Sequence, residues 1–155
     1  MEIRKAKEDD CDRLIILLKQ IATIHYQKRP DIFKENAIKY KASELALLLK
    51  DESRPIFVAT EDNKVIGYAF LQINLVKNSS MLCDRKALYL DDLCVDENLR
   101  GNGYGKKLFS FVKNYAKEIG CVSIDLNVWE LNDMAISFYE KCGMSIQKRH
   151  MELTL

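Results

Sequence analysis

One stretch near the middle of the chain, residues 88–120, combines a strand, a glycine-rich turn and a helix. It begins with the apolar run Leu88–Val95, which two aspartates interrupt. A polar connector then leads to the alternating glycines Gly101, Gly103 and Gly105, and an amphipathic helix follows. Glycines at a strand-to-helix junction leave backbone N–H groups uncovered at the positive end of a helix, where phosphate groups bind. The stretch therefore predicts a phosphorylated ligand.

The spacing of these glycines excludes two common nucleotide-binding motifs. In the dinucleotide fingerprint a glycine stands three places after Gly103, but Lys106 occupies that position. The Walker motif needs a glycine, a lysine and then serine or threonine, whereas Gly105 precedes Lys106 and Lys107. The pattern that remains is Arg-x-x-Gly-x-Gly, beginning at Arg100. Taken alone, this pattern also fits an ordinary helix start in which the glycines only form a turn.

Composition favours one domain and excludes several kinds of partner. A chain of 155 residues with 48% hydrophobic residues suffices for one buried core, so we expect a single domain over residues 1–155. The 24 basic and 23 acidic residues nearly balance, which gives no electrostatic reason to expect nucleic acid or membrane as a partner. The 5 cysteines are scattered, without a metal-binding pair or an even set for disulfides. We therefore expect no metal and a reduced, cytoplasmic setting. No run approaches membrane-spanning length, and the first residues contain no apolar signal region.

The order of apolar and turn-forming residues predicts an α/β (α+β) fold, a mixed, mostly antiparallel sheet flanked by helices. The predicted order of elements is β-α-α-β-β-β-α-β-α-β. Strands are expected at 2–6, 56–60, 65–76, 88–95, 121–128 and 145–155, and helices between 10 and 30, over 35–50, after Gly105 and from the capping Asn132 to Gly143. Because the last strand is rich in polar residues, it is expected at an edge of the sheet.

Two motifs together resemble the GCN5-related N-acetyltransferase (GNAT) family. The Arg-x-x-Gly-x-Gly turn, placed after a strand and before a helix, is similar to the loop with which this family binds the pyrophosphate of acetyl-CoA. The later stretch LNVWELNDMAISFYEKCGM resembles the family's closing motif, with Asn132, Ala135, Tyr139 and Gly143 in matching places. The order of elements matches as well, although the family often has two strands where this chain shows one at its end. The resemblance covers essentially the whole chain.

The resemblance implies acetyl-CoA as the cosubstrate, bound in a gap between two strands that splay apart. A strand that leaves its neighbour has free backbone groups, with which the pantetheine amides can pair. The residues implied to bind the cosubstrate are Leu93, Cys94 and Val95 on the strand, Arg100, Gly101, Asn102, Gly103, Tyr104, Gly105 and Lys106 in the turn, and Asn127, Asn132 and Ala135 on the far wall.

The reaction implied by the resemblance is direct attack of a primary amine on the thioester. The amine must lose a proton, and the leaving thiolate benefits from gaining one. Tyr139 matches the tyrosine that commonly serves as general acid, and Asp91 matches an acidic residue that some polyamine acetyltransferases of the family use to handle the proton of the amine. Tyr139 also fits a core aromatic, and Asp91 and Asp92 also fit structural ion pairs with Arg85 or Lys86. Because successive strand residues point to opposite faces, only one aspartate is expected to face the acceptor.

The resemblance implies an acceptor site between the first two helices and the strands. The candidates for binding the acceptor are His25, Asp31 and Asp92. An aspartate attracts a cationic amine, whereas Arg29 favours an anionic group, so the acceptor is a small-molecule or peptide amine that the sequence does not identify. His25 also fits an ordinary packing position at the end of an apolar helix face. Trp129 and Phe138 are expected in the core.

Two functions of different classes remain. The first is an N-acetyltransferase that uses acetyl-CoA and a primary amine. The alternative is a non-catalytic acyl-CoA-binding or interaction module on the same fold, since a fold does not determine function. The presence of both Tyr139 and the pair of aspartates favours the enzyme. The sequence leaves a homodimer open and identifies no regulator.

Overall fold

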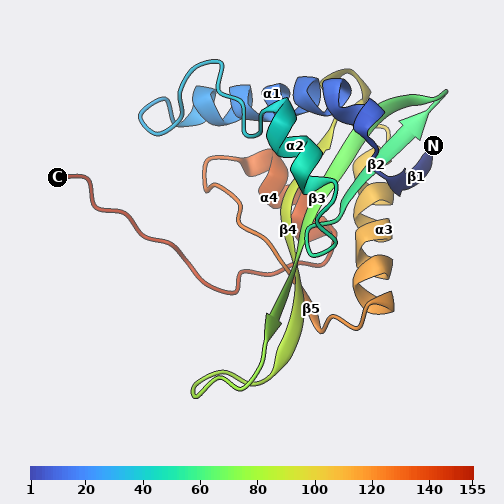
Figure 1. Ribbon diagram of the computed structural model, residues 1–155. Coiled ribbons are helices and arrows are strands. Elements are labelled where there is room, and N and C mark those ends of the chain that lie inside the picture. Colours follow the sequence, from blue (N-terminus) through green and yellow to red (C-terminus); the bar gives the residue numbers. More distant parts are fainter.

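One five-stranded sheet runs through the computed structural model, which describes residues 1–155 (Figure 1). Its strands are β1 (Glu2–Lys5), β2 (Ile56–Glu61), β3 (Lys64–Val76), β4 (Arg85–Val95) and β5 (Ser123–Asp125). They lie in the order β1-β2-β3-β4-β5, and every neighbouring pair is antiparallel except β4 and β5, which are parallel. The predicted mixed, mostly antiparallel sheet is therefore confirmed.

Helices cover both faces of this sheet. They are α1 (Cys11–Lys28), α2 (Ala42–Leu48), α3 (Tyr104–Glu118) and α4 (Asp133–Lys141), with short 3-10 turns at Glu8–Asp10 and Glu97–Leu99. One buried cluster packs α1 and α2 against the sheet, and it contains the wholly buried Leu14, Leu17 and Leu45. A second cluster packs α3 and α4 against the opposite face, around Leu108 and Val112. None of the helices is long and apolar enough to cross a membrane.

The second predicted helix begins later than expected. α2 starts only at Ala42, because Asn36 has a left-handed backbone (φ 56°) that interrupts a helix. The first turn of α2 is capped by Glu44, whose carboxylate accepts a hydrogen bond from the Lys41 N–H at 2.6 Å. Residues 29–41 therefore form an irregular segment, the α1–α2 connector, that is free to follow the surface of the sheet.

The strand predicted over residues 145–155 is absent, so this prediction is wrong. The chain after α4 is an extended tail that leaves the body of the molecule (Figure 1). β5 is only three residues long and pairs on one side alone, with β4, so it offers a short ladder for a further strand. Apolar side chains of the tail remain in solvent, with Leu153 84% exposed. The element order of the chain therefore ends at α4.

A β-bulge in β4 changes the direction of its two aspartates. Asp92 lies opposite Phe70 of β3, and the next residue of β3 already lies opposite Leu90, so Asp91 is an extra residue without a partner. Strict alternation would place Leu90 and Cys94 on the same face, yet Leu90 packs in the α3 cluster and Cys94 in the α1 cluster. The bulge turns both carboxylates toward the α1–α2 connector. The expectation that Asp91 and Asp92 point to opposite faces is wrong because it assumed an unbroken strand.

β4 and β5 separate soon after they begin to pair. Only Ala87–Tyr89 of β4 pairs with β5, while β4 continues to Val95 beside β3. From Leu90 to Val95, the edge of β4 that faces away from β3 has no strand next to it. The gap between splayed strands that the family resemblance implies is therefore present.

Candidate active site

A cavity of about 720 Å³ opens at this gap. It is bounded by β4, the first turn of α3, α4, the C-terminal half of α1 and the α1–α2 connector. Its volume is typical of small-molecule and cofactor sites. Every site residue expected from the sequence lines it except Asn102 and Asp31. The lining thus includes His25, Asp91, Asp92, Leu93, Cys94, Val95, Arg100, Gly101, Gly103, Tyr104, Gly105, Lys106, Asn127, Asn132, Ala135 and Tyr139.

The glycine turn presents an uncapped helix N-terminus to the cavity. Gly101 and Gly103 have left-handed backbones, with φ of 82° and 80°, which glycine adopts without steric cost. The first backbone hydrogen bond of α3 runs from the Lys107 N–H to the Gly103 carbonyl oxygen (3.1 Å), so the N–H groups of the preceding turn have no acceptor within the helix. No side chain caps this end, and no acidic residue lies in its first turn. The turn is therefore open to an anion from outside the chain.

Arg100 adds an unsatisfied donor beside the turn. Its Nε donates a hydrogen bond to the Val95 carbonyl oxygen at 3.1 Å. Its Nη2 is buried and has no hydrogen-bond partner. A buried polar group without a partner costs about 1–3 kcal/mol, and more when it is charged. A ligand that brings an acceptor to this nitrogen recovers that free energy.

The far wall of the cavity is formed by α4 and the segment before it. Asn132 caps α4 as predicted, because its Oδ1 accepts a hydrogen bond from the Ala135 N–H at 3.2 Å. Asn127 donates a hydrogen bond from Nδ2 to the Tyr89 hydroxyl at 3.1 Å. The polar residues expected on this wall are thus fixed by hydrogen bonds to the backbone and to β4.

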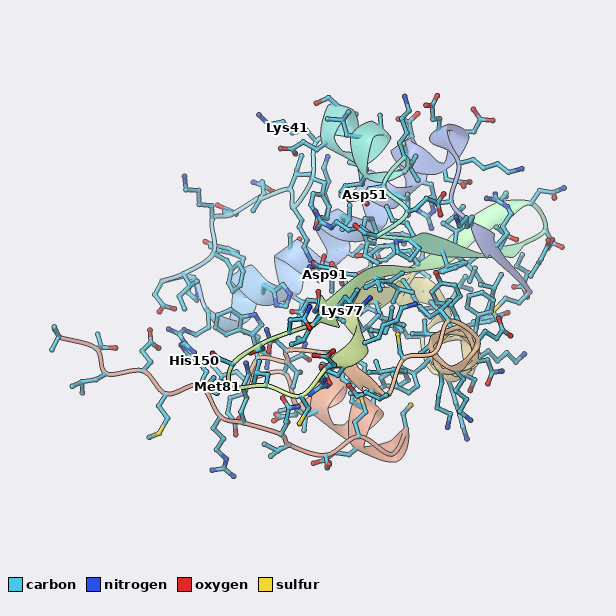
Figure 2. All side chains as sticks on the ribbon, turned by 60° about the horizontal axis from the view of Figure 1, so that its bottom comes forward. Lys41, Asp51, Lys77, Met81, Asp91 and His150 are labelled. Atoms are coloured by element: carbon cyan, nitrogen blue, oxygen red, sulfur yellow. The ribbon has the colours of Figure 1, made fainter.

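The two aspartates form an ion-paired cluster with the α1–α2 connector. Lys39 Nζ lies 3.0 Å from Asp91 Oδ2 and 3.6 Å from Asp92 Oδ2. The Tyr40 hydroxyl donates a hydrogen bond to Asp91 Oδ2 at 3.0 Å. Figure 2 shows Asp91 in the middle of the molecule, between α1 and the strands. The acid pair therefore already binds a primary ammonium group, that of Lys39.

Asp92 is the more buried of the two acids, with 11% of its side chain exposed against 22% for Asp91. Burial raises the pKa of Asp92 to about 6, an effect that Lys39 opposes and the charge of Asp91 reinforces. The wholly buried hydroxyl of Tyr68 faces Asp92 and Cys94 without completing a hydrogen bond to either. A raised pKa of this kind occurs in catalytic acids and in structural ion pairs alike.

Tyr139 reaches the cavity from α4. Its ring packs edge-on against Phe109 and Phe138, with centroid distances of 6.0 and 5.1 Å. Burial, and then the charge of Asp92, raise the pKa of the Tyr139 hydroxyl, which keeps this group protonated and able to donate. The two alternatives considered for Tyr139 are therefore compatible, because its ring belongs to the core packing while the residue lines the cavity.

Cys94 is the one thiol in the cavity lining. It is 2% exposed, and its Sγ lies 3.8 Å from the Leu17 carbonyl oxygen. Burial, and then the negative charge of Asp92, raise the pKa of this thiol to about 12. Because the thiolate is the reactive form, Cys94 is a poor nucleophile at neutral pH.

Two predicted site residues lie outside the cavity. Asp31 is exposed and forms an ion pair with Arg29 at 2.7 Å, and Arg29 also binds Glu152 of the tail at 2.9 Å. Asp31 suggested a cationic acceptor and Arg29 an anionic one, and these two opposite charges therefore neutralise each other. Asn102 does not line the cavity either, and its Nδ2 donates a hydrogen bond to the Leu99 carbonyl oxygen at 3.2 Å. The geometry supports neither residue as a ligand-binding group.

Aromatic residues surround His25 in the cavity. Its ring stacks on Phe33 at 5.0 Å, and Phe33 meets Trp129 edge-on at 5.2 Å. Burial, and then the nearby Lys39, lower the pKa of His25, which favours the neutral imidazole. Phe138 packs against the core as expected. The core assignment of Trp129 is wrong, because Trp129 is 39% exposed on the irregular segment between β5 and α4.

Lys39 and Tyr40 are the site residues that sequence analysis missed. They were expected within a helix, and no periodicity connects this segment with the bulge in β4. The expected partners of the acid pair are engaged elsewhere, Arg85 with Asp125 at 3.4 Å and Lys86 with the Ile119 carbonyl oxygen at 2.6 Å. Two adjacent acids in a mostly apolar strand were the only signal that a cation must lie nearby.

No group of three or more His, Cys, Asp or Glu side chains is placed to hold a metal ion.

Comparisons with known proteins agree with this geometry. Residues 18–144 match the model of the acetyltransferase (GNAT) family. The chain is similar to thialysine N-epsilon-acetyltransferase of Bos taurus, with 27% identity over 151 residues that cover 91% of this chain and 82% of that protein. Its structure resembles that of a mutant BH1408 protein from Bacillus halodurans, with a TM-score of 0.96 and 32% identity over 100% of this chain and 99% of the other. The aminoglycoside N-acetyltransferase AAC(6')-Iy, solved in complex with CoA, shares the fold at 18% identity and a TM-score of 0.72, over 99% and 98% of the two chains. The family match over most of the chain places this protein among its members: the chain belongs to the GNAT family of acetyltransferases.

Proposed function

We propose that this chain moves the acetyl group of acetyl-CoA to a primary amine by direct attack. One observation carries the proposal: a single cavity joins an open anion-binding turn to an acid pair that already binds an ammonium group. The turn suits the cosubstrate, and the acid pair suits a protonated amine. A module that only binds acyl-CoA has no need of the second feature.

The unpaired edge of β4 would hold acetyl-CoA, which supplies the acetyl group as a thioester. On the edge of β4 that faces away from β3, Leu93–Val95 has no strand beside it, so its backbone there is free to pair with the pantetheine amides. The N–H groups between Gly101 and Lys106 suit the pyrophosphate, and the free Nη2 of Arg100 suits an oxygen of the same ligand. A second, more open hollow of about 580 Å³ adjoins this turn and extends along α3 past Ser110 and Asn114. The nucleotide part of acetyl-CoA would have room there.

The state of Cys94 supports direct attack over a covalent acetyl-enzyme. Its thiol is buried, and its raised pKa of about 12 keeps it protonated at neutral pH. The amine is then the nucleophile that attacks the thioester. All the cysteines of the chain are free, which also supports the proposal of a reduced, cytoplasmic setting.

The acid pair would manage the proton of the acceptor. As the C–N bond forms, the nitrogen becomes acidic and must release a proton to a base. The family resemblance favoured Asp91 for this role, but the Tyr40 hydroxyl and Lys39 already occupy its Oδ2. We propose that Asp91 orients the ammonium group and that Asp92, with its pKa of about 6, accepts the proton. Tyr139 would donate its proton to the leaving thiolate.

The acid pair favours a cationic alkylamine as the acceptor. Two carboxylates beside an apolar cavity select a positive charge carried on an apolar stem. One similar protein bears the name thialysine N-epsilon-acetyltransferase, which specifies a side-chain amine of this kind. Thialysine, lysine and ornithine are therefore the first acceptors to test, with polyamines, amino sugars and peptide N-termini as comparisons.

The experiment that tests the proposal is CoA release from acetyl-CoA in the presence of each amine. An enzyme releases CoA at a rate that depends on the amine, and the acetylated amine accumulates in equal amount. The alternative, a non-catalytic acyl-CoA-binding module, binds acetyl-CoA but releases no CoA with any amine.

We also propose a homodimer, which the sequence left open. Its support is the tail of residues 145–155, which pairs with no strand of its own chain, together with the free edge of β5. Exposed apolar residues alternate near the end of this tail, Met151, Leu153 and Leu155, as on one face of a strand. The tail of one chain would add to the β5 edge of the other. Light scattering of the whole chain and of a form that ends at Gly143 tests this, because only the whole chain should be dimeric.

A further inference from the structure

The acid pair holds the ammonium group of Lys39 through three oxygen atoms of the β4 bulge. Lys39 Nζ lies 3.0 Å from Asp91 Oδ2 and 3.6 Å from Asp92 Oδ2. It also donates a hydrogen bond to the Asp91 carbonyl oxygen at 3.3 Å. Lys39 therefore occupies the place at which the proposed function puts the ammonium group of an external acceptor, and it lines the same cavity as Leu93 and Tyr139.

Tyr40 fixes Lys39 in this position. The Tyr40 hydroxyl donates a hydrogen bond to Asp91 at 3.0 Å, and its ring stacks on Phe70 at 5.6 Å. Arg54 donates a further hydrogen bond from Nη2 to the Tyr40 hydroxyl at 3.3 Å. These contacts hold the end of the α1–α2 connector on the sheet, so that Lys39 enters the cavity. Lys41 lies instead at the outer edge of the molecule, far from Asp91 in the view of Figure 2.

We propose that Lys39 is itself an acetyl acceptor: without an external amine, the chain transfers the acetyl group of acetyl-CoA to its own Lys39 Nζ. This inference rests on the proposed function. The transfer modifies Lys39. Lys39 also competes with an external amine, because the same two carboxylates bind both amino groups.

The reaction is balanced with the groups already present. The Lys39 ammonium first gives one proton to Asp92 or to water. The nitrogen lone pair then forms a bond to the acetyl carbon, and the bond between that carbon and the sulfur of CoA breaks. Asp92 passes the first proton to solvent and then accepts the second nitrogen proton, and the thiolate takes the proton of Tyr139, which solvent replaces. The products are N-acetyl-Lys39 and CoA, and no oxidant or further reactant is required.

The charge around Lys39 sets the pH dependence of this step. Burial favours the neutral amine, but the carboxylates of Asp92 and Asp91 outweigh this effect and raise the pKa of Lys39 above its usual value. The other titratable or charged groups near this cluster are His25 on α1, Tyr40 on the connector, Arg54 before β2, Tyr68 on β3, Cys94 on β4 and Tyr139 on α4. Below its pKa, the fraction of neutral Lys39 rises about tenfold per pH unit. The rate of self-acetylation is therefore expected to rise with pH throughout the neutral and mildly alkaline range.

The test is mass spectrometry of the whole chain incubated with acetyl-CoA and no amine. We expect one acetyl group per chain, located on Lys39 by peptide sequencing, at a rate at least about tenfold above that of the exposed Lys34 and Lys41 in the same molecules. These two lysines report the uncatalysed reaction with acetyl-CoA. The rate per chain should not change when the protein is diluted, because the transfer occurs within one chain. Thialysine or lysine should slow it by competing for the acid pair.

Two matched variants complete the test. Lys39→Arg keeps the positive charge but carries no amine that reacts, so the fast acetylation should disappear. Lys41→Arg makes the same change two residues away and should leave the fast acetylation of Lys39 intact. Labelling of Lys39 no faster than that of Lys34 and Lys41, or a rate per chain that falls on dilution, overturns the inference. CoA release with external amines is measured in the same buffer. Amine-dependent release would leave the proposed function standing when self-acetylation fails, and no release would show that both have failed.

Discussion

Arg100 and Val95 are joined by a hydrogen bond from Nε to the carbonyl oxygen at 3.1 Å, and this bond holds the guanidinium with its Nη2 buried and unpaired. The free chain therefore maintains a donor that no atom of its own satisfies. Because such a donor costs free energy until a ligand meets it, Arg100 should contribute far more to binding than to folding.

Arg100→Met is expected to weaken CoA binding about 10- to 100-fold, since a charge-assisted hydrogen bond is lost. The free energy of unfolding without ligand should change by less than about 1 kcal/mol, because the lost bond to Val95 is offset by removal of the unpaired nitrogen. Calorimetric titration with CoA and thermal unfolding measure the two quantities. Lys117→Met removes the same charge at the far end of α3 and is the control, which should bind CoA normally.

Gly103 and Gly120 provide a matched pair at the two ends of α3. Both have left-handed backbones, with φ of 80° and 75°, and a Cβ on either would meet no atom within 4 Å. Aspartate at either position should therefore cost a similar backbone strain, on the order of 1 kcal/mol. Gly103→Asp also places a carboxylate at the anion-binding turn, so CoA should no longer raise the Tm of this variant. Gly120→Asp should keep the full CoA-induced shift, and equal loss in both variants would point to folding instead of the turn.

Asp92→Asn should stabilise the protein at neutral pH. The pKa of Asp92 is raised from 3.8 to about 6 in the folded chain, so the folded state binds more protons than the unfolded state between these values. Stability attributable to this group is therefore full below about pH 4 and is lost as pH rises through 6. The loss is on the order of 2–3 kcal/mol. Denaturant unfolding should show Asp92→Asn more stable than the parent at pH 7.5 and equal to it near pH 3.5.

The same variant should be a poor enzyme. If Asp92 accepts the proton of the amine, the parent's kcat/KM should rise with pH through about 6, and this rise should be absent in Asp92→Asn. We expect kcat to fall on the order of 10²-fold. A variant that is more stable yet retains the parental pH profile would leave Asp92 as a structural acid only. Asp91→Asn is the comparison, and it should raise the KM for the amine more than it lowers kcat.

Tyr139→Phe separates packing from proton donation. The ring contacts with Phe109 and Phe138 remain, so the free energy of unfolding should change by no more than about 1 kcal/mol. Loss of the hydroxyl should lower kcat on the order of 10²-fold, with little change in acetyl-CoA affinity. Steady-state kinetics and thermal unfolding of the same preparation give both values. Normal turnover would reduce Tyr139 to a core aromatic.

The parts of the site that the sequence predicted depend on local signals. The glycine turn, the start of α3 and the Asn132 cap of α4 are each determined by a few neighbouring residues. The order of strands and helices along the chain, as far as α4, followed from the alternation and spacing of apolar runs. These features need no knowledge of which distant segments meet.

The parts that the sequence did not predict depend on contacts between distant segments. The bulge at Asp91 is a property of the pairing between β3 and β4, and no residue in β4 alone signals it. Lys39 reaches the acid pair only because Asn36 interrupts the expected helix and Tyr40 binds Asp91. The tail has the alternation of a strand but finds no partner in its own chain.

Direct transfer from acetyl-CoA to an amine is tested by the initial rate of CoA release with acetyl-CoA and a cationic amine varied together, beginning with thialysine. Direct attack within one cavity requires both substrates to be bound at once, so double-reciprocal plots should give intersecting lines, with one acetylated amine formed per CoA released. Parallel lines would indicate a covalent acetyl-enzyme. Tight binding of acetyl-CoA without amine-dependent CoA release would contradict acetyl transfer by this chain and identify it as a binding module.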